Sequence, residues 1–419
     1  MKDSNLIAGN KGLIILLILA FLLRLVWIII FPSLDLEADF FSDAKDYDQT
    51  ALGLVKGQGY HNQGFHAYRP PGYPFFLAAI YKIFGHNYFA VKITQVALGT
   101  TSILLLFLII LRLLGQKVAI ISALFFSFYP EFLRYPTELL SETLFIFLIL
   151  LSLFLAIRSI DSNSMVFPLF SGGCLGLSIL TREIGFALLP VVFLLIVKRQ
   201  SAAPETGRRL RKAFLIFIAT AIVVLPWTIR NYLIFHQPIV VSTNGGINFY
   251  IGNNLSATGT YNFKIPPVDN PSEQQSSDNS NGNFLYELQL NSNGYREGFK
   301  FIKQHPEFFL RGLIKKAKLF WMPPLHQIDF NQNTLRSLYR VLWATSYTFL
   351  LVSAVLGLVY LIMIRATIWQ PILLWILLVM GVHLLTYLDS RYRLPVMPFM
   401  IFFSSAAVAR WLPLRKKEA

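Results

Sequence analysis

The sequence predicts an all-α protein that crosses a membrane many times, and its bulk properties carry this prediction. Hydrophobic residues make up 55% of the 419 residues, charged residues make up 14%, and the mean hydropathy is +0.54. Soluble globular domains carry about 25% charged residues. The formal net charge of +15 is therefore expected in loops that flank the membrane, and not on a surface for nucleic acid.

About ten apolar segments, some of which borrow flanking residues, are long enough to be transmembrane helices. We expect them to pack as a single membrane domain over residues 1–419. We also expect the first segment to be retained as a helix, because Pro32-Ser33-Leu34-Asp35 is a poor signal-peptide cleavage site. The predicted segments are Gly12–Phe31, Tyr88–Leu114, Val118–Tyr129, Leu139–Ile157, Val166–Leu180, Ile184–Val197, Phe214–Ile229, Tyr339–Ile364, Trp369–Leu385 and Pro395–Leu412.

Basic residues between these segments predict the orientation. With ten crossings, the basic clusters all fall on one side, which the positive-inside rule assigns to the cytoplasm. We therefore expect a multi-pass protein of the cytoplasmic (inner) membrane with both termini in the cytoplasm. The cations counted are Lys2, Lys11, Arg112, Lys117, Arg158, Lys198, Arg199, Arg208, Arg209, Arg211, Lys212, Arg365, Arg415, Lys416 and Lys417.

Two long polar segments then face outward, namely a first extracytoplasmic loop (residues 32–87) and a large extracytoplasmic loop (residues 231–337). In the second, the charge density of Pro306–Trp321 suits an amphipathic helix at the membrane interface. Pro238–Val241 and Asn248–Ile251 are candidates for short strands.

The first loop contains the most informative stretch, Ser42–Pro74. Ser42 is a candidate cap for a helix with one apolar face that lies on the membrane surface, and Asp43 occupies its first turn. Gly57 and Gly59 end that helix, and Arg69-Pro70-Pro71 delays the next one until after the prolines. A carboxylate at the membrane edge beside a returning arginine indicates a site for an anionic lipid-linked substrate.

Further unusual residues gather on the same predicted outer side. Arginine is disfavoured there, so these side chains need compensation, either from lipid headgroups and nearby carboxylates or from a bound phosphate or diphosphate lipid. Glu142 lies a turn inside the predicted fourth helix, where an unpaired charge costs much free energy, so we expect it to have a functional or hydrogen-bonding role. Arg182 is a candidate binding residue, and the alternative is that it only forms an ion pair with its neighbour Glu183. The arginines are Arg69, Arg182, Arg230, Arg391 and Arg393.

Together these motifs resemble the membrane-embedded glycosyltransferases of the GT-C fold, in particular the bacterial glycosyltransferase-39-like group. This group is akin to protein O-mannosyltransferases and lipid A aminoarabinose transferases. The pattern runs from Asp43-Ala44 to Arg69-Pro70-Pro71-Gly72-Tyr73-Pro74. The other matching pieces are Ser141-Glu142-Thr143-Leu144-Phe145, Leu180-Thr181-Arg182, Pro226-Trp227, Arg230-Asn231-Tyr232, Gly252-Asn253-Asn254 and Arg391-Tyr392-Arg393-Leu394-Pro395.

The resemblance implies a bundle of about ten transmembrane helices and a catalytic carboxylate at Asp43. It also implies a polyprenyl-phosphate-sugar donor and transfer with inversion at the outer face. Ala44 departs from the acidic pair of the protein mannosyltransferases. We also expect no C-terminal soluble domain to hold an acceptor, so the acceptor stays open between lipid, glycan and protein. We expect the substrate-binding residues to be Arg69, Tyr73, Glu142, Arg182, Arg230, Asn253, Arg391 and Arg393.

We expect no cofactor, because the phosphate of the donor is itself the leaving group. A divalent metal held by His61 and His66 is not favoured, since their spacing fixes no third ligand. The expected partners are the lipid donor, the acceptor and membrane lipids, and no nucleic acid. Two alternative functions stay open: an O-antigen ligase or polymerase that uses a diphosphate-linked glycan, and a lipid-linked sugar transporter or flippase.

Overall fold

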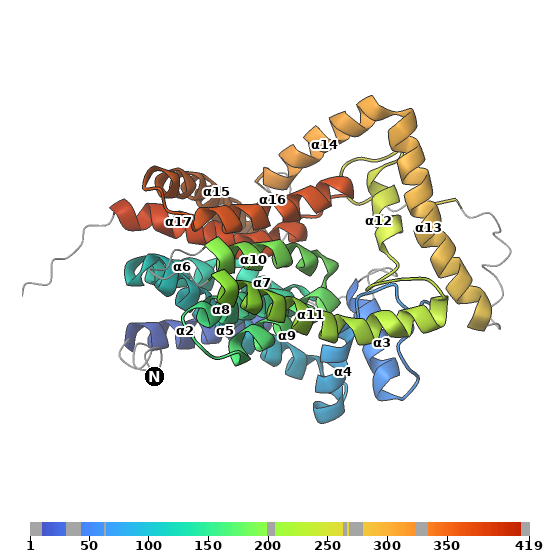
Figure 1. Cartoon of the computed structure of the whole chain (residues 1–419), viewed down its shortest axis with the longest axis horizontal. Coiled ribbons are helices and arrows are strands. Elements are labelled where there is room, and N and C mark those ends of the chain that lie inside the picture. Colours follow the sequence, from blue (N-terminus) through green and yellow to red (C-terminus); the bar gives the residue numbers. More distant parts are fainter. Residues whose placement is uncertain are drawn as a thin grey trace, which may run out of the picture.

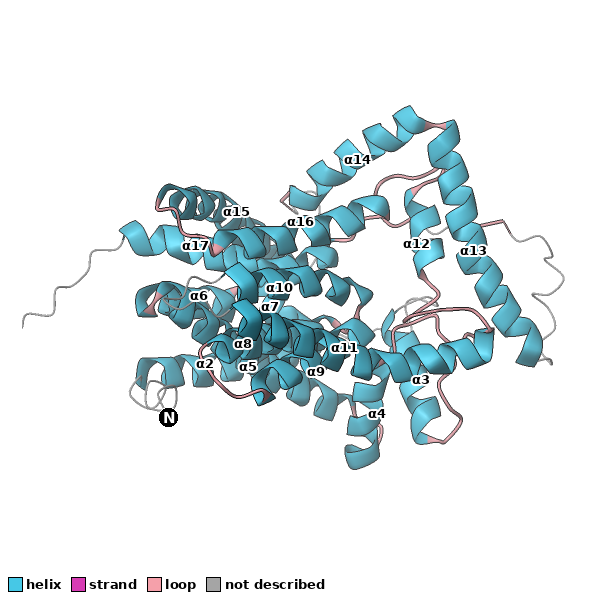
Figure 2. Ribbon diagram, in the orientation of Figure 1, coloured by secondary structure: helices cyan, strands magenta, loops and turns pink. Residues whose placement is uncertain are grey.

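The computed structural model describes residues 11–30, 43–62, 64–198, 206–262, 266–267, 280–323 and 334–411. Within these ranges the regular structure is helical, and the only β-type pairings are two isolated bridges, Asn62 with Phe65 and Thr260 with Leu388. Figure 2 shows helices joined by loops, and no strand, in the described parts of the chain. The predicted all-α fold class is therefore confirmed.

A bundle of long helices forms the body of the molecule (Figure 1). Each of the ten predicted apolar segments falls on one of its helices. Their bounds are α2 (Lys11–Ile30), α5 (Tyr88–Leu114), α6 (Gln116–Phe128), α8 (Glu142–Ile160), α9 (Val166–Thr181), α10 (Leu188–Lys198), α11 (Thr206–Phe235), α15 (Thr334–Met363), α16 (Trp369–Leu385) and α17 (Met397–Trp411).

Six helices among the described residues are long and apolar enough to cross a membrane alone, and seven if a bent pair counts as one span. The bent pair is α6 with the segment Pro130–Thr137, which contains α7 (Pro130–Arg134) and η1 (Tyr135–Thr137). Helices α9 and α16 are apolar but shorter than a bilayer normally requires. The chain is thus an integral multi-pass membrane protein, and ten crossings stay a prediction.

Helices α9 and α11 pack closely because α9 carries small residues at its contact. A side chain added at Gly172 would meet the carbonyl oxygen of Ile216 at 2.3 Å, and one added at Gly176 would meet Val223 at 2.6 Å. Small residues four apart are the usual way in which helices within membranes approach closely. Any larger side chain at Gly172 would therefore separate the two helices.

The helices of the two predicted outer segments lie at one end of the bundle, opposite the first turn of α2 and the last turn of α17 (Figure 1). From the first segment come α3 (Asp43–Val55) and α4 (Gly72–Phe84). From the second come α12 (Gly245–Gly252), α13 (Ser280–Gln304) and α14 (Pro306–Trp321). The short helices η2 (Glu183–Ala187) and η5 (Ser390–Val396) precede α10 and α17.

Helix α3 is the predicted helix of the first loop, although its candidate cap Ser42 lies outside the described residues. Its apolar side packs on α4, where the rings of Tyr47 and Tyr73 meet edge to face with centroids 4.9 Å apart. Gly57 and Gly59 follow α3 with φ of 75° and 87°, conformations that glycine adopts without strain. Helix α4 begins directly after the two prolines, as predicted.

The strand predictions for the large loop are wrong. Asn248–Ile251 lies inside helix α12, and Pro238–Val241 forms no strand. Short apolar runs do not distinguish strand from helix, and here the packing of α12 against α13 decides the conformation. The prediction that Glu142 lies a turn inside the fourth helix is also wrong, because α8 begins at Glu142.

Candidate active site

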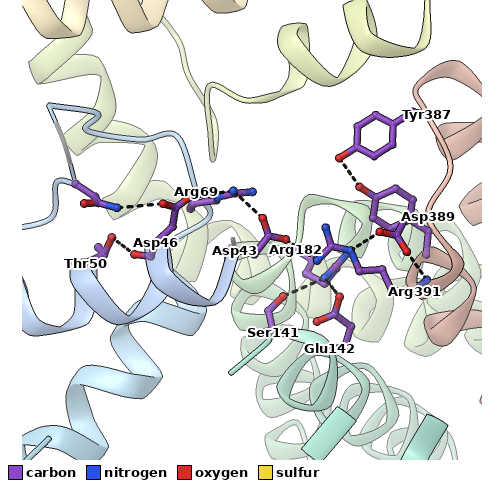
Figure 3. A network of polar contacts seen from close by, with 12 residues as sticks. Asp43, Asp46, Thr50, Arg69, Ser141, Glu142, Arg182, Tyr387, Asp389 and Arg391 are labelled. Carbon is purple, nitrogen blue, oxygen red and sulfur yellow. Dashed lines mark hydrogen bonds and ion pairs between the residues drawn. The ribbon is translucent and has the colours of Figure 1, made fainter. Parts of the chain in front are cut away.

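Asp43 is the first residue of α3, and two arginines from distant parts of the chain converge on its carboxylate (Figure 3). Arg69, just before α4, places its Nη2 atom 2.7 Å from Oδ1, and Arg391 of η5 places its Nη1 atom 2.5 Å from Oδ2. The three side chains are 15 to 20% exposed. The cluster is thus largely enclosed but still reachable by a ligand.

Asp46, one turn further along α3, binds the same arginine. Its Oδ2 atom accepts hydrogen bonds from Nε and Nη2 of Arg69 at 3.1 and 2.9 Å, and its Oδ1 atom accepts from Asn62 at 3.3 Å. Residues three apart on a helix face the same way. Asp46 was not among the predicted site residues, although this spacing from Asp43 is a signal that can identify it.

A second ion pair lies next to the first. Arg182, between α9 and η2, donates to Oε1 of Glu142 at 2.7 Å and to the hydroxyl of Ser141 at 3.0 Å. Glu142 is 1% exposed, and its Oε2 atom is buried without a hydrogen-bond partner among the described residues. Glu183 turns away from Arg182 and accepts from the backbone N–H and hydroxyl of Ser242 at 2.9 and 2.6 Å. The alternative Arg182–Glu183 pair is therefore wrong.

The two carboxyl groups that share Arg69 have opposite pKa shifts. Burial by itself raises the pKa of Asp43, but the charges of Arg69, Arg391 and Arg182 outweigh it and hold the pKa well below its ordinary value. Burial also raises the pKa of Asp46, and Arg69 only partly offsets this rise. Asp43 is therefore the more firmly ionised of the two carboxylates.

Two other predicted arginines donate mainly to backbone carbonyls. Arg230 donates to the carbonyls of His66 and Tyr60 at 2.6 and 2.8 Å. Arg393 donates to the carbonyls of Phe320 and Met322 at 3.3 and 2.8 Å. Neither side chain is paired with the Asp43 cluster by these contacts, and both hold separate segments of the chain together.

Tyr73 and Asn253 also form hydrogen bonds within the protein. The hydroxyl of Tyr73, a fully buried residue, donates to Oε1 of Gln95 at 2.9 Å. The side-chain amide of Asn253 donates to the carbonyls of Phe249 and Leu385 at 2.8 and 2.7 Å. Their predicted roles in substrate binding stay predictions, now with a structural role beside each.

His61 and His66 lie in the first loop with ring centroids 6.1 Å apart. In the part of the chain that the structure describes, no group of three or more histidine, cysteine, aspartate or glutamate side chains is placed to hold a metal ion. The polar groups of the candidate site, as far as the structure describes them, are therefore its arginines and carboxylates.

Sequence and structure comparisons extend this description. Residues 68–229 match the family model for dolichyl-phosphate-mannose-protein mannosyltransferase. No curated protein sequence matches the chain.

The structure of the Archaeoglobus fulgidus oligosaccharyltransferase in its apo form is similar, with a TM-score of 0.56 and 14% identity over 95% of this chain and 50% of that one. This chain therefore spans about half the length of that enzyme. ArnT from Cupriavidus metallidurans, bound to undecaprenyl phosphate, gives a TM-score of 0.43 and 13% identity over 96% of this chain and 78% of that one. The predicted resemblance is confirmed: the chain is a membrane protein of the GT-C glycosyltransferase fold.

Proposed function

We propose that the protein is an inverting glycosyltransferase that moves a sugar from a polyprenyl-phosphate-linked donor to an acceptor hydroxyl. The observation that carries this proposal is the carboxylate of Asp43 held between Arg69 and Arg391, with Arg182 beside it. A guanidinium group binds two oxygens of a phosphate in the same bidentate geometry in which it binds two oxygens of a carboxylate. A donor phosphate can therefore take over the positions that Asp43 and its neighbours occupy around these arginines.

The similar fold of the archaeal oligosaccharyltransferase supports a lipid phosphate as ligand. One structure of that enzyme is described as a complex with an inhibitory peptide and a dolichol-phosphate, and it matches this chain with a TM-score of 0.55 and 14% identity. The corresponding ligand of this chain is the phosphate of a polyprenyl carrier, bound by Arg69 and Arg391, with Glu142 orienting Arg182.

The reaction is a single displacement at the anomeric carbon. The acceptor oxygen forms the new C–O bond and gives its proton to Asp43, while the bond between the anomeric carbon and the phosphate oxygen breaks and its electron pair stays on the phosphate. Negative charge grows on the leaving phosphate, so the arginines stabilise the transition state more than the ground state. When the phosphate draws Arg69 and Arg391 toward itself, Asp43 loses ion-pair partners and becomes a better base.

The arrangement of the helices supports a site at the outer face of the cytoplasmic membrane. Helices α3 and α13 lie at the end of the bundle opposite the first turn of α2 and the last turn of α17 (Figure 1). If the basic clusters face the cytoplasm, both termini are cytoplasmic and Asp43 faces outward, in the first of the two extracytoplasmic loops.

The test is the substitution Asp43→Asn, which keeps the shape of the side chain and removes its charge and basicity. We expect transfer from a polyprenyl-phosphate sugar to be lost while the purified protein stays folded. The matched control is Asp161→Asn, which removes another aspartate paired with an arginine, Arg112 at 3.2 Å, outside this site. Full transfer by a folded Asp43→Asn protein would contradict the proposal.

Mass spectrometry of lipids and glycans from cells that lack the protein distinguishes the alternative functions. A glycan that lacks one sugar, restored by the wild-type gene and not by Asp43→Asn, supports transfer of a single sugar. Loss of an entire glycan chain supports a ligase or polymerase with a diphosphate-linked donor. Accumulation of an unchanged lipid-linked sugar, with restoration by Asp43→Asn, supports a transporter.

A further inference from the structure

The part of the first loop that leads to Arg69 is held in place by residues from distant segments of the chain. At His66 and Ala67, both backbone N–H groups donate to the carboxylate of Glu287 on α13, at 2.6 and 2.9 Å. The carbonyl of His66 accepts from Arg230 at 2.6 Å, and that of Ala67 accepts from the backbone N–H of Thr243 at 2.9 Å. All four backbone polar groups of this dipeptide are therefore satisfied by residues far along the chain.

Glu287 suits this position because an ionised carboxylate only accepts hydrogen bonds. Its Oε1 atom accepts from Ala67 N–H and the Thr243 hydroxyl, and its Oε2 atom accepts from His66 N–H. The side chain is 1% exposed, and burial raises its pKa although these donors counteract the rise. A glutamine here would have one acceptor oxygen fewer and would point an NH₂ group at an N–H.

The same contacts reach Arg69. The hydroxyl of Tyr60 donates to the carbonyl of Arg69 at 2.8 Å, and Arg230 donates to the carbonyl of Tyr60 at 2.8 Å. Ala67 lies two residues before Arg69. The backbone of Arg69 is thus fixed on one side through Tyr60 and on the other through the dipeptide that Glu287 holds.

Packing joins α13 to this loop independently of the hydrogen bonds. Ala67 is fully buried in a cluster with Phe235, Ile239 and Leu288, the residue next to Glu287. The ring of Phe65 also lies against that of Tyr286, with centroids 6.3 Å apart. A displacement of this part of α13 would therefore move the segment that carries Arg69.

We propose that Glu287 is a positioning residue of the Asp43 site, which acts by holding the His66–Ala67 backbone so that the guanidinium of Arg69 faces Asp43. Glu287 acts through Arg69 and does not itself touch the reacting atoms. Helix α13 of the large outer segment then becomes part of the machinery that shapes the phosphate site. The inference rests on the proposed function for its ligand, and on the contacts above for its mechanism.

The first test measures hydrogen–deuterium exchange in the full-length protein. We expect Glu287→Gln to speed exchange of the His66 and Ala67 amides by roughly tenfold or more, because their charged acceptor is lost. The matched control is Glu297→Gln, on the same helix, where the carboxylate pairs only with Arg296 and Lys300 in the described contacts. Unchanged exchange in Glu287→Gln overturns the proposal.

The second test measures affinity for polyprenyl phosphate in detergent micelles. We expect Glu287→Gln to weaken binding roughly tenfold and Glu297→Gln to leave it unchanged. In an Arg69→Ala background, Glu287→Gln should cause no further loss, because its effect passes through Arg69. An equal loss in both backgrounds indicates general destabilisation and overturns the positioning role.

Thr243→Val provides a second variant if Glu287→Gln does not fold. It removes one donor to Glu287 and should give a smaller loss of affinity in the same direction, again absent in the Arg69→Ala background. Unchanged affinity of Thr243→Val together with unchanged exchange at Ala67 contradicts the proposal. A wild-type protein that does not bind polyprenyl phosphate contradicts the proposed function instead, and the exchange experiment still decides the contacts of Glu287.

Discussion

Two groups of arginines lie toward the same end of the molecule, and they differ in what their guanidinium groups contact. Arg69, Arg182 and Arg391 face carboxylate side chains, whereas Arg230 and Arg393 face backbone carbonyls. A side-chain carboxylate can be exchanged for a phosphate, since both are anions that an arginine binds through two oxygens. A backbone carbonyl is fixed by the fold, so the arginine that holds it stabilises structure.

Among the arginines, the largest expected effect comes from removing one of the carboxylate-facing group. Arg391→Gln should lower the rate of transfer roughly 10²- to 10³-fold, the usual result of losing one hydrogen-bond donor to a developing oxyanion. The melting temperature should change little, because Asp43 keeps its ion pair with Arg69. Kinetics with a polyprenyl-phosphate sugar and a thermal melt check both. A variant that is unstable yet fully active per folded molecule would place Arg391 in the other group.

The opposite result is expected for Arg393→Gln. Arg393 is 5% exposed, bridges two carbonyls and lies with its guanidinium carbon 4.4 Å from the centroid of the Tyr347 ring. The substitution should cost about 2–4 kcal/mol of stability, because buried carbonyls lose a charged donor. Activity per folded molecule should stay within about threefold of wild type, as expected for a site that does not contact the substrate. A hundredfold loss in a stable protein would contradict this.

The pH dependence of stability should separate the two carboxylates that share Arg69. The lowered pKa of Asp43 means that its contribution is present above the pKa of an unfolded aspartate, about 3.9, and is lost as pH falls below it. The pKa of Asp46 is raised, so its contribution is present below about 3.9 and is lost as pH rises through the folded value.

Thermal melts of Asp43→Asn and Asp46→Asn against wild type, measured over a series of pH values, check this. Relative to wild type, Asp46→Asn should become more stable as pH rises above about 4, and Asp43→Asn should recover only in stronger acid. If the stabilities of the two variants change with pH in the same direction, the pKa values of Asp43 and Asp46 are not shifted in opposite directions, and the prediction is wrong.

The sequence predicts where both groups of arginines lie, but not what each guanidinium contacts. Counting cations in loops predicts the same side of the membrane for all five arginines, because the positive-inside rule needs no knowledge of contacts. It does not predict that Arg393 finds the carbonyls of Phe320 and Met322, because which backbone groups end unpaired depends on where distant helices stop.

The same limit explains Asp46 and Glu287. Asp46 follows Asp43 by three residues on a predicted helix, so its place beside Arg69 can be deduced from spacing. Glu287 lies in a polar stretch without a recognisable motif, and its role depends on the backbone of His66 and Ala67, more than two hundred residues earlier. Side-chain acceptors for a loop backbone have no sequence pattern, because any buried carboxylate with suitable geometry serves.

The smallest effect is expected for Tyr73→Phe, which tests whether a predicted binding residue belongs with the structural group. The substitution removes the hydroxyl that donates to Gln95 and keeps the ring that packs on Tyr47. Gln95 still donates to the carbonyls of Pro136 and Glu138, so only one hydrogen bond is lost, at a cost of about 1 kcal/mol. The rate of transfer should stay within about twofold, as for a group that the transition state does not touch. A loss of transfer well beyond that range, without a change in the melting temperature, would place the Tyr73 hydroxyl in the substrate site. In that case the Tyr73 ring would hold α3, which carries Asp43, against α4, and the Tyr73 hydroxyl would contact the sugar.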